Sequence, residues 1–197
     1  MKKIGIALLA IILLGCQQNG DINKEPSASQ DTPTQSNDDY SLDKNEYIED
    51  VLFRVNSEWE YNNTISNSDK KYYYFDDNSG FIMVTITEIP SGVNNESVLE
   101  DTVQSLENAN EFNITSVEDD EVSDMSAKRI KGTFSADNEE YNCYHEIFIM
   151  EETGYTFSVF SNKEINETEQ LFNKFVDTIH PMSSSVSSQT DDIFDFN

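Results

Sequence analysis

Two side chains that could act together in catalysis, Cys143 and His145, stand two residues apart in a largely apolar stretch. On a β-strand such residues share a face, so the thiol could serve as a nucleophile and the imidazole as its base. A cysteine in this setting is more often a small buried hydrophobe, with the histidine as a satisfied neighbour. We therefore expect no enzyme and no catalytic residues, and a hydrolase using Cys143 and His145 is only a minor alternative.

Three short motifs begin like metal sites, and the surrounding sequence argues against each. His145-Glu146 starts like the zinc-protease HExxH helix, but the second histidine is missing and the segment favours a strand. Asp76–Gly80 starts like a calcium loop, yet Thr87 stands where that loop needs glutamate, which favours a hairpin turn. The acids Glu118–Glu121 could hold a hard cation, but a solvated loop between strands explains them more simply. We expect no metal site and no cofactor.

Cys16 carries the strongest chemical prediction in the chain. It follows a short basic segment and the eleven-residue apolar run Ile4–Leu14, which is too short to span a bilayer. The run ends in Leu13-Leu14-Gly15-Cys16, which resembles the lipobox of bacterial lipoproteins. The resemblance implies cleavage after Gly15 and lipidation of the Cys16 thiol, and two or more acyl chains such as palmitate give a stable membrane anchor. An ordinary secretory signal with an incidental cysteine is the alternative.

The charge of the chain restricts its partners. The formal net charge is −26, and removal of the N-terminal signal would delete two lysines and no acid, leaving 10 basic and 38 acidic side chains, or −28. Such a surface repels nucleic acids and anionic headgroups, so we exclude nucleic-acid binding. It attracts cations or basic partners, although a solvated surface explains the charge without any specific site. With Cys16 acylated, Cys143 has no intrachain disulfide partner.

Composition divides the chain into four segments. We predict a signal peptide at 1–15, the lipidated cysteine and a disordered acidic linker at 16–44, one domain at 45–181, and a Ser-rich disordered tail at 182–197. The linker has too few apolar residues for a core, and as a flexible coil it spans about 30 Å. A second possibility for the tail is that its apolar end, Ile193–Phe196, docks on a sheet edge or groove.

Apolar periodicity indicates two helices and several strands in the domain. Leu99, Val103 and Leu106 fall on one face of a helix that Asn94 or Asn95 can cap. Turn residues separate alternating and aromatic runs, which are typical of strands. The predicted strands cover 51–55, 72–75, 81–87, 112–117, 126–135, 141–150 and 155–160, and the predicted helices cover 94–109 and 166–179.

The closing helix, 166–179, is expected to stop at Pro181 with His180 at its C-terminal end. Short turns require antiparallel pairing between consecutive strands. The sequence therefore predicts an α+β fold in which an antiparallel sheet of six or seven strands is flanked by helices, as an α/β/α-type sandwich.

The order of these elements is similar to the PsbP-like superfamily, which includes photosystem II extrinsic proteins, Ran-binding import factors of the Mog type and many bacterial lipoproteins. The resemblance covers about residues 48–180. At two turns the chain departs from the family, since Asn56 replaces a proline and Ser123 or Asp124 replaces a glycine. At the end, His180-Pro181 replaces a Ser-aromatic pair. The resemblance implies binding or assembly roles, and no functional residue is carried over. It rests on Val55-x-x-x-Trp59, the aromatic hairpin, helix 95–109, Gly154–Val159, and the closing helix with Phe172 and Ile179.

Together these observations predict a lipoprotein held at the extracytoplasmic face of the cell membrane by Cys16. Its domain is expected to act as a non-catalytic binding or assembly module for a protein or cell-envelope partner. The main alternative is a small-molecule or cation receptor associated with a transporter, which needs a concave polar pocket between sheet and helix.

Overall fold

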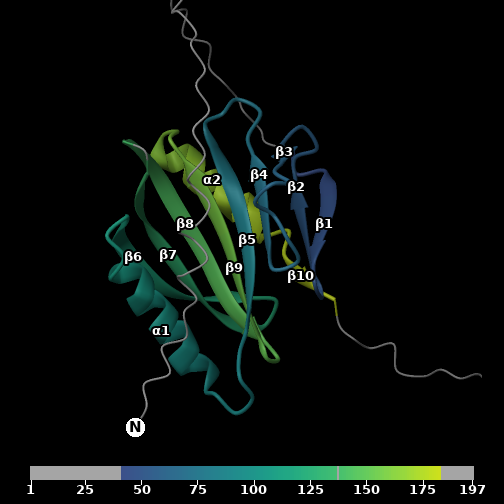
Figure 1. Cartoon of the computed structure of the whole chain (residues 1–197), viewed down its shortest axis with the longest axis vertical. Helices are drawn as coiled ribbons and strands as arrows, with labels where there is room; N and C mark the ends of the chain where they lie inside the picture. The colour runs from purple at the N-terminus through teal and green to yellow at the C-terminus, as the bar shows by residue number, and fades with distance from the viewer. Residues whose placement is uncertain (1–40, 137, 183–197) are drawn as a thin grey trace, which may run out of the picture.

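The computed structural model describes residues 41–136 and 138–182 as one α+β domain (Figure 1). The predicted signal peptide, Cys16, most of the predicted linker and the tail from 183 onward lie outside the described residues. The elements, in chain order, are β1 (Lys44–Ile48), β2 (Val51–Val55), β3 (Glu60–Tyr61), β4 (Lys70–Tyr74), β5 (Gly80–Glu88), α1 (Asn95–Glu107), β6 (Phe112–Val122), β7 (Met125–Ala136), β8 (Glu139–Met150), β9 (Thr153–Ser161), α2 (Ile165–Val176) and β10 (His180–Pro181).

Seven strands form one antiparallel sheet in the order β3-β4-β5-β9-β8-β7-β6, which confirms the predicted fold class. A smaller sheet has the order β1-β2-β10. Figure 1 shows α1 on one side of the large sheet, against β6, β7 and β8. On the other side, α2 packs against β8, β9 and β2, so the small sheet and α2 cover that face together.

Both faces of the central strands are buried, which explains why their sequences are aromatic rather than strictly alternating. On the α2 side, Phe53 of β2 meets Phe157 of β9 and Phe175 of α2 edge to face, with ring centroids 5.5 and 6.1 Å away. On the α1 side, Leu99 and Phe160 belong to a second apolar cluster. The sheet therefore separates two cores, each closed by a different helix.

The acid run Glu118–Glu121 lies in β6, so the prediction of a loop there was wrong. The strand is eleven residues long, and its register places Glu118, Asp119 and Asp120 opposite Arg129, Lys128 and Ala127 of β7. Opposite charges on facing strands stabilise the pairing, and a sequence window that covers one strand cannot reveal this.

The closing helix is shorter than predicted. It ends at Val176, and the next residues form a turn in which Thr178 Oγ1 donates to Phe175 O at 2.7 Å. His180 and Pro181 form β10 opposite Leu52 and Val51 of β2, so placing His180 at a helix terminus was wrong. A proline is tolerated there because β10 is an edge strand.

The start of the domain was only partly predicted. Lys44 begins β1, an unpredicted strand that pairs with β2, and Leu42 just before it packs against the α2-side core. Within the described part of the chain, neither helix is long and apolar enough to cross a membrane.

Candidate functional site

Cys143 and His145 share a face of β8, as predicted, but that face is inside the core under α1. Both side chains have 0% exposure. His145 Nδ1 is hydrogen-bonded with Ser158 Oγ at 2.8 Å, and the Phe112 and Phe160 rings lie 5.6 and 5.5 Å from its ring. Burial raises the pKa of Cys143 to about 12 and lowers the pKa of His145 to about 4. A buried thiol paired with no base fits a packing role better than a hydrolase.

The next residue, Glu146, points to the opposite face and joins an ion cluster beneath α2. It has 0% exposure, and its Oε2 accepts from Arg129 Nε at 2.9 Å. Arg129 also contacts Asp120 of β6 at 2.8 Å and donates to Asn173 of α2 at 3.1 Å. Glu146 Oε1 has no hydrogen-bond partner, and burial raises the pKa of Glu146 to about 7 despite the guanidinium. The cluster therefore links α2 to β6, β7 and β8 through hydrogen bonds and ion pairs.

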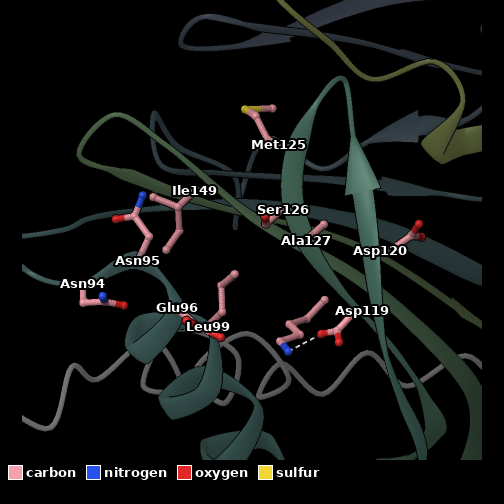
Figure 2. Close-up of a pocket in the computed structure, with 11 residues that line it drawn as sticks. Asn94, Asn95, Glu96, Leu99, Asp119, Asp120, Met125, Ser126, Ala127 and Ile149 are labelled. Carbon is pink, nitrogen blue, oxygen red and sulfur yellow. Dashed lines mark hydrogen bonds and ion pairs between the residues drawn. The ribbon is translucent and has the colours of Figure 1, made fainter.

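A cleft opens on the α1 side, where the large sheet divides. β7 pairs with β6 from Met125 onward, but it pairs with β8 only from Ala127 onward. Beyond that point, Ile149 of β8 pairs with β9 alone. The first turn of α1 faces this gap, and the resulting hollow has a volume of about 590 Å³ (Figure 2). Its lining consists of Asn94, Asn95, Glu96, Leu99, Asp119, Asp120, Met125, Ser126, Ala127, Lys128 and Ile149.

The cleft has an apolar floor and a charged rim. We call Leu99 and Ile149, which are 4% and 8% exposed and belong to the α1-side core, the floor. Figure 2 shows Leu99 of α1 and Ile149 of β8 directed into the space between their elements. The rim on the α1 side carries the carboxylates of Glu96 and Asp119, whereas the Asp120 carboxylate is paired with Arg129 on the α2 side. An amphipathic ligand could therefore bury its apolar part while its polar part stays at the mouth.

Lys128 is the single cation among the described lining residues, and it forms an ion pair with Asp119. The hydrogen bond that Lys128 donates to Asp119 raises the pKa of Lys128, and the charges of Asp119, Glu100 and Glu96 raise it further. The ammonium group thus sits in a negative field. The net potential at the rim attracts positive charge in spite of Lys128.

The walls of the cleft are fixed by local structure. Asn94 caps α1, as predicted, with its Oδ1 accepting from Ser97 N at 3.1 Å. The β6–β7 turn consists of Ser123 and Asp124, whose φ angles are 49° and 68°. These values lie in the left-handed region that glycine favours, so two residues other than glycine hold a strained backbone at this turn.

Sequence analysis did not predict this cleft. Asp119 and Asp120 were assigned to a loop, and Lys128 was not among the predicted site residues. Among the described residues, no group of three or more His, Cys, Asp or Glu side chains is arranged to hold a metal ion. A smaller hollow of about 360 Å³ lies at the start of α2, around Asn142 and Lys163.

Comparison with known proteins identifies the fold. No protein-family model and no curated protein matches the chain. Among solved structures, cyanobacterial PsbP (CyanoP) from Synechocystis superposes with a TM-score of 0.50 at 13% identity, covering 67% of this chain and 86% of CyanoP. The fold is PsbP-like. At this level of identity the likeness establishes the architecture alone.

Two further structures share this PsbP-like fold. LpqN from Mycobacterium tuberculosis, described as involved in cell envelope biogenesis, superposes with a TM-score of 0.51 at 14% identity, covering 66% of this chain and 83% of LpqN. A Bacteroides thetaiotaomicron protein gives 0.52 at 11% identity, covering 73% of this chain and 50% of that protein. The fold is therefore found in proteins from distant bacteria, and fold alone does not assign a function.

Proposed function

We propose that this protein is a lipoprotein anchored by Cys16 at the extracytoplasmic face of the cell membrane, where its PsbP-like domain acts as a non-catalytic binding or assembly module. The partner is a protein or another component of the cell envelope. The lipobox-like Leu13–Cys16 segment supports the anchor. LpqN, which has the same fold and a described role in envelope biogenesis, is consistent with the location.

The observation that carries the binding role is the contrast between the buried Cys143/His145 pair and the open cleft at α1. The residues with nucleophile and base chemistry have 0% exposure and are not bonded to each other. The accessible hollow has carboxylates, an ammonium group and an apolar floor instead. The described lining residues include neither cysteine nor histidine, and the groups present suit recognition of a ligand through charge and apolar contact.

The anchor is tested by replacing Cys16 with serine in the full chain. Wild-type protein should incorporate an alkyne-labelled fatty acid and enter the detergent phase in a Triton X-114 separation. Cys16→Ser should do neither, because serine has no thiol to accept the lipid. An unmodified wild-type protein in the aqueous phase would refute the proposed location.

The binding role is tested with two matched variants of β7. Ser126→Trp fills the cleft, whereas Ser135→Trp makes the same change at an exposed position on the same strand outside it. Each full-length protein is crosslinked in intact cells, and the adducts are identified by mass spectrometry. A partner that is lost with Ser126→Trp and kept with Ser135→Trp supports recognition through the cleft. Identical adducts from both variants would place the partner surface elsewhere, and no reproducible adduct would argue against an assembly role.

A small-molecule receptor is the second candidate, because the concave polar hollow that this alternative requires is present between α1 and the sheet. Its volume of about 590 Å³ lies in the usual range for small-molecule sites. The cation form of this candidate has less support, since the described residues do not supply a cluster of metal ligands. Mass spectrometry of protein purified under native conditions distinguishes a retained small molecule from a protein partner.

A further inference from the structure

The α1 cleft combines an apolar floor with an acidic rim. Its floor is apolar and is contributed by two elements, through Leu99 of α1 and Ile149 of β8. Its rim is negative around Lys128, because Glu96 and Glu100 add their charges to that of Asp119, the ion-pair partner of Lys128. A ligand that satisfies both must be cationic at one end and apolar along its length.

The strand geometry explains why the floor is open. Met125 and Ser126 are paired to β6 but not to β8, so the two strands separate before their ends. Neighbouring strands in a sheet are normally about 4.8 Å apart, which leaves no room for a ligand. The end of this pairing therefore leaves the hollow open beside Ile149.

We propose that this cleft binds an alkyl chain ending in an ammonium or guanidinium group, with the charged end at the acidic rim and the methylene groups on the apolar floor. The proposal rests on the binding role proposed above and specifies its chemistry. Asp120 is already held by Arg129 at 2.8 Å. Glu96 and Asp119 are therefore the carboxylates that remain to contact the ligand, with the ligand displacing Lys128 from Asp119.

Two sources could present this chemistry, a free aliphatic amine or a lysine or arginine side chain of a partner. Both would be attracted by a chain with a net charge of −26. Surface attraction alone is independent of chain length and vanishes in salt, whereas each methylene buried on the floor adds about fourfold in affinity. A dependence of affinity on chain length therefore distinguishes binding in the cleft from general attraction to the acidic surface.

The experiment is an NMR titration of the intact domain with n-propylamine and n-pentylamine in 150 mM salt. Both ligands carry one positive charge and differ by two methylene groups. Amide signals of Ser126, Ala127 and Ile149 and of the first turn of α1 should shift, and pentylamine should bind about fifteenfold more tightly. Equal affinity for both amines, or shifts spread over the acidic surface, would overturn the proposal.

Matched variants complete the test. Glu96→Gln and Asp119→Asn should each weaken pentylamine binding at least fivefold, because each removes a rim charge. Glu107→Gln, at the far end of α1 and outside the cleft, should change it less than twofold. Equal effects from all three would overturn the site. Pentanoate is the opposite-charge control, and stronger shifts with pentanoate would assign an anion to Lys128 instead.

The source of the cation follows from a second comparison, between 1,5-diaminopentane and a lysine residue capped at both ends. Tighter binding of the diamine points to a free amine, and tighter binding of the capped lysine points to a protein partner. The proposed function can fail separately. If the protein does not bind amines but still forms the crosslink that depends on Ser126, only this inference is refuted. If it binds amines but no crosslinked partner is found, the assembly role is refuted and the receptor role remains.

Discussion

Glu146→Gln should stabilise the folded protein at neutral and alkaline pH, although it removes one member of a buried ion pair. Burial raises the pKa of Glu146 from its ordinary value of 4.5 to about 7 in the fold. At about 1.4 kcal/mol per pH unit, the ionised form is therefore disfavoured by about 3 kcal/mol relative to the unfolded chain. Attraction to Arg129 is already included in this balance, and burial outweighs it.

The pH dependence has a defined sign. Between pH 4.5 and pH 7 the folded protein keeps the Glu146 proton while the unfolded chain releases it, so wild-type stability falls as pH rises through this range. Glutamine does not titrate. The difference in unfolding free energy between Glu146→Gln and wild type should be near zero at pH 4 and should grow by about 3 kcal/mol up to pH 8. An amide nitrogen left without an acceptor would reduce the gain by about 1 kcal/mol.

The assay is urea denaturation followed by circular dichroism at closely spaced pH values from 4 to 8.5. Subtracting the two curves cancels the other acids and His145, because they are common to both proteins. The control is Glu169→Gln, which removes a partly exposed partner of Lys131 at 2.6 Å and should change stability by less than about 1 kcal/mol throughout. If Glu146→Gln were less stable than wild type at pH 8, ionised Glu146 would be a net stabiliser and the reasoning would be refuted.

Four further predictions concern other parts of the fold. Asp124→Gly should raise unfolding free energy by about 1 kcal/mol, since glycine relieves the φ of 68°; a loss of stability in urea melts would contradict this. Cys143 should resist iodoacetamide in the folded protein and react fully in 6 M guanidinium, and rapid native labelling would show that α1 opens readily. Phe157→Ala should cost about 3 to 5 kcal/mol by calorimetry, because its ring packs on both Phe53 and Phe175; a cost under 1 kcal/mol would mean that the core collapses around the gap. The lowered pKa of His145 makes wild type lose stability as pH falls from 6.5 to 4, and His145→Leu should abolish that part of the acid dependence, while an unchanged profile would exclude His145 as its source.

Elements with a strong local pattern were predicted well. The spacing of Leu99, Val103 and Leu106 located α1, and the Asp76–Gly80 turn located the β4–β5 hairpin, where Ser79 N donates to Asp77 Oδ1 at 2.9 Å. The central strands β7, β8 and β9 were also found nearly in full, because long apolar runs between turn residues have few alternatives. Local sequence therefore determined most of the large sheet and both helices.

The elements that were not predicted from the sequence depend on contacts between distant segments of the chain. β1 and β10 are short strands whose hydrogen bonds come from β2, and neither has an apolar pattern of its own. The acids of β6 were read as a loop because their compensating charges, Lys128 and Arg129, lie on the next strand. The cleft itself needs the divergence of β7 from β8 and the placement of α1, which no local motif encodes. Its one local signal was the capped start of α1 at Asn94.

The outer edge of β6 has a consequence for protein crowded on a membrane. An exposed edge strand is a template for pairing with another copy, and lipid anchoring would concentrate such edges in two dimensions. Here the ladder is interrupted by a bulge between Ile114 and Ser116. The bulge is followed by the four consecutive acids Glu118–Glu121. The β6 strand of a second molecule approaching this edge would bring the same four negative charges against them. Repulsion and irregular geometry at the same edge would keep neighbouring molecules from joining into continuous sheets, so dense display need not lead to aggregation.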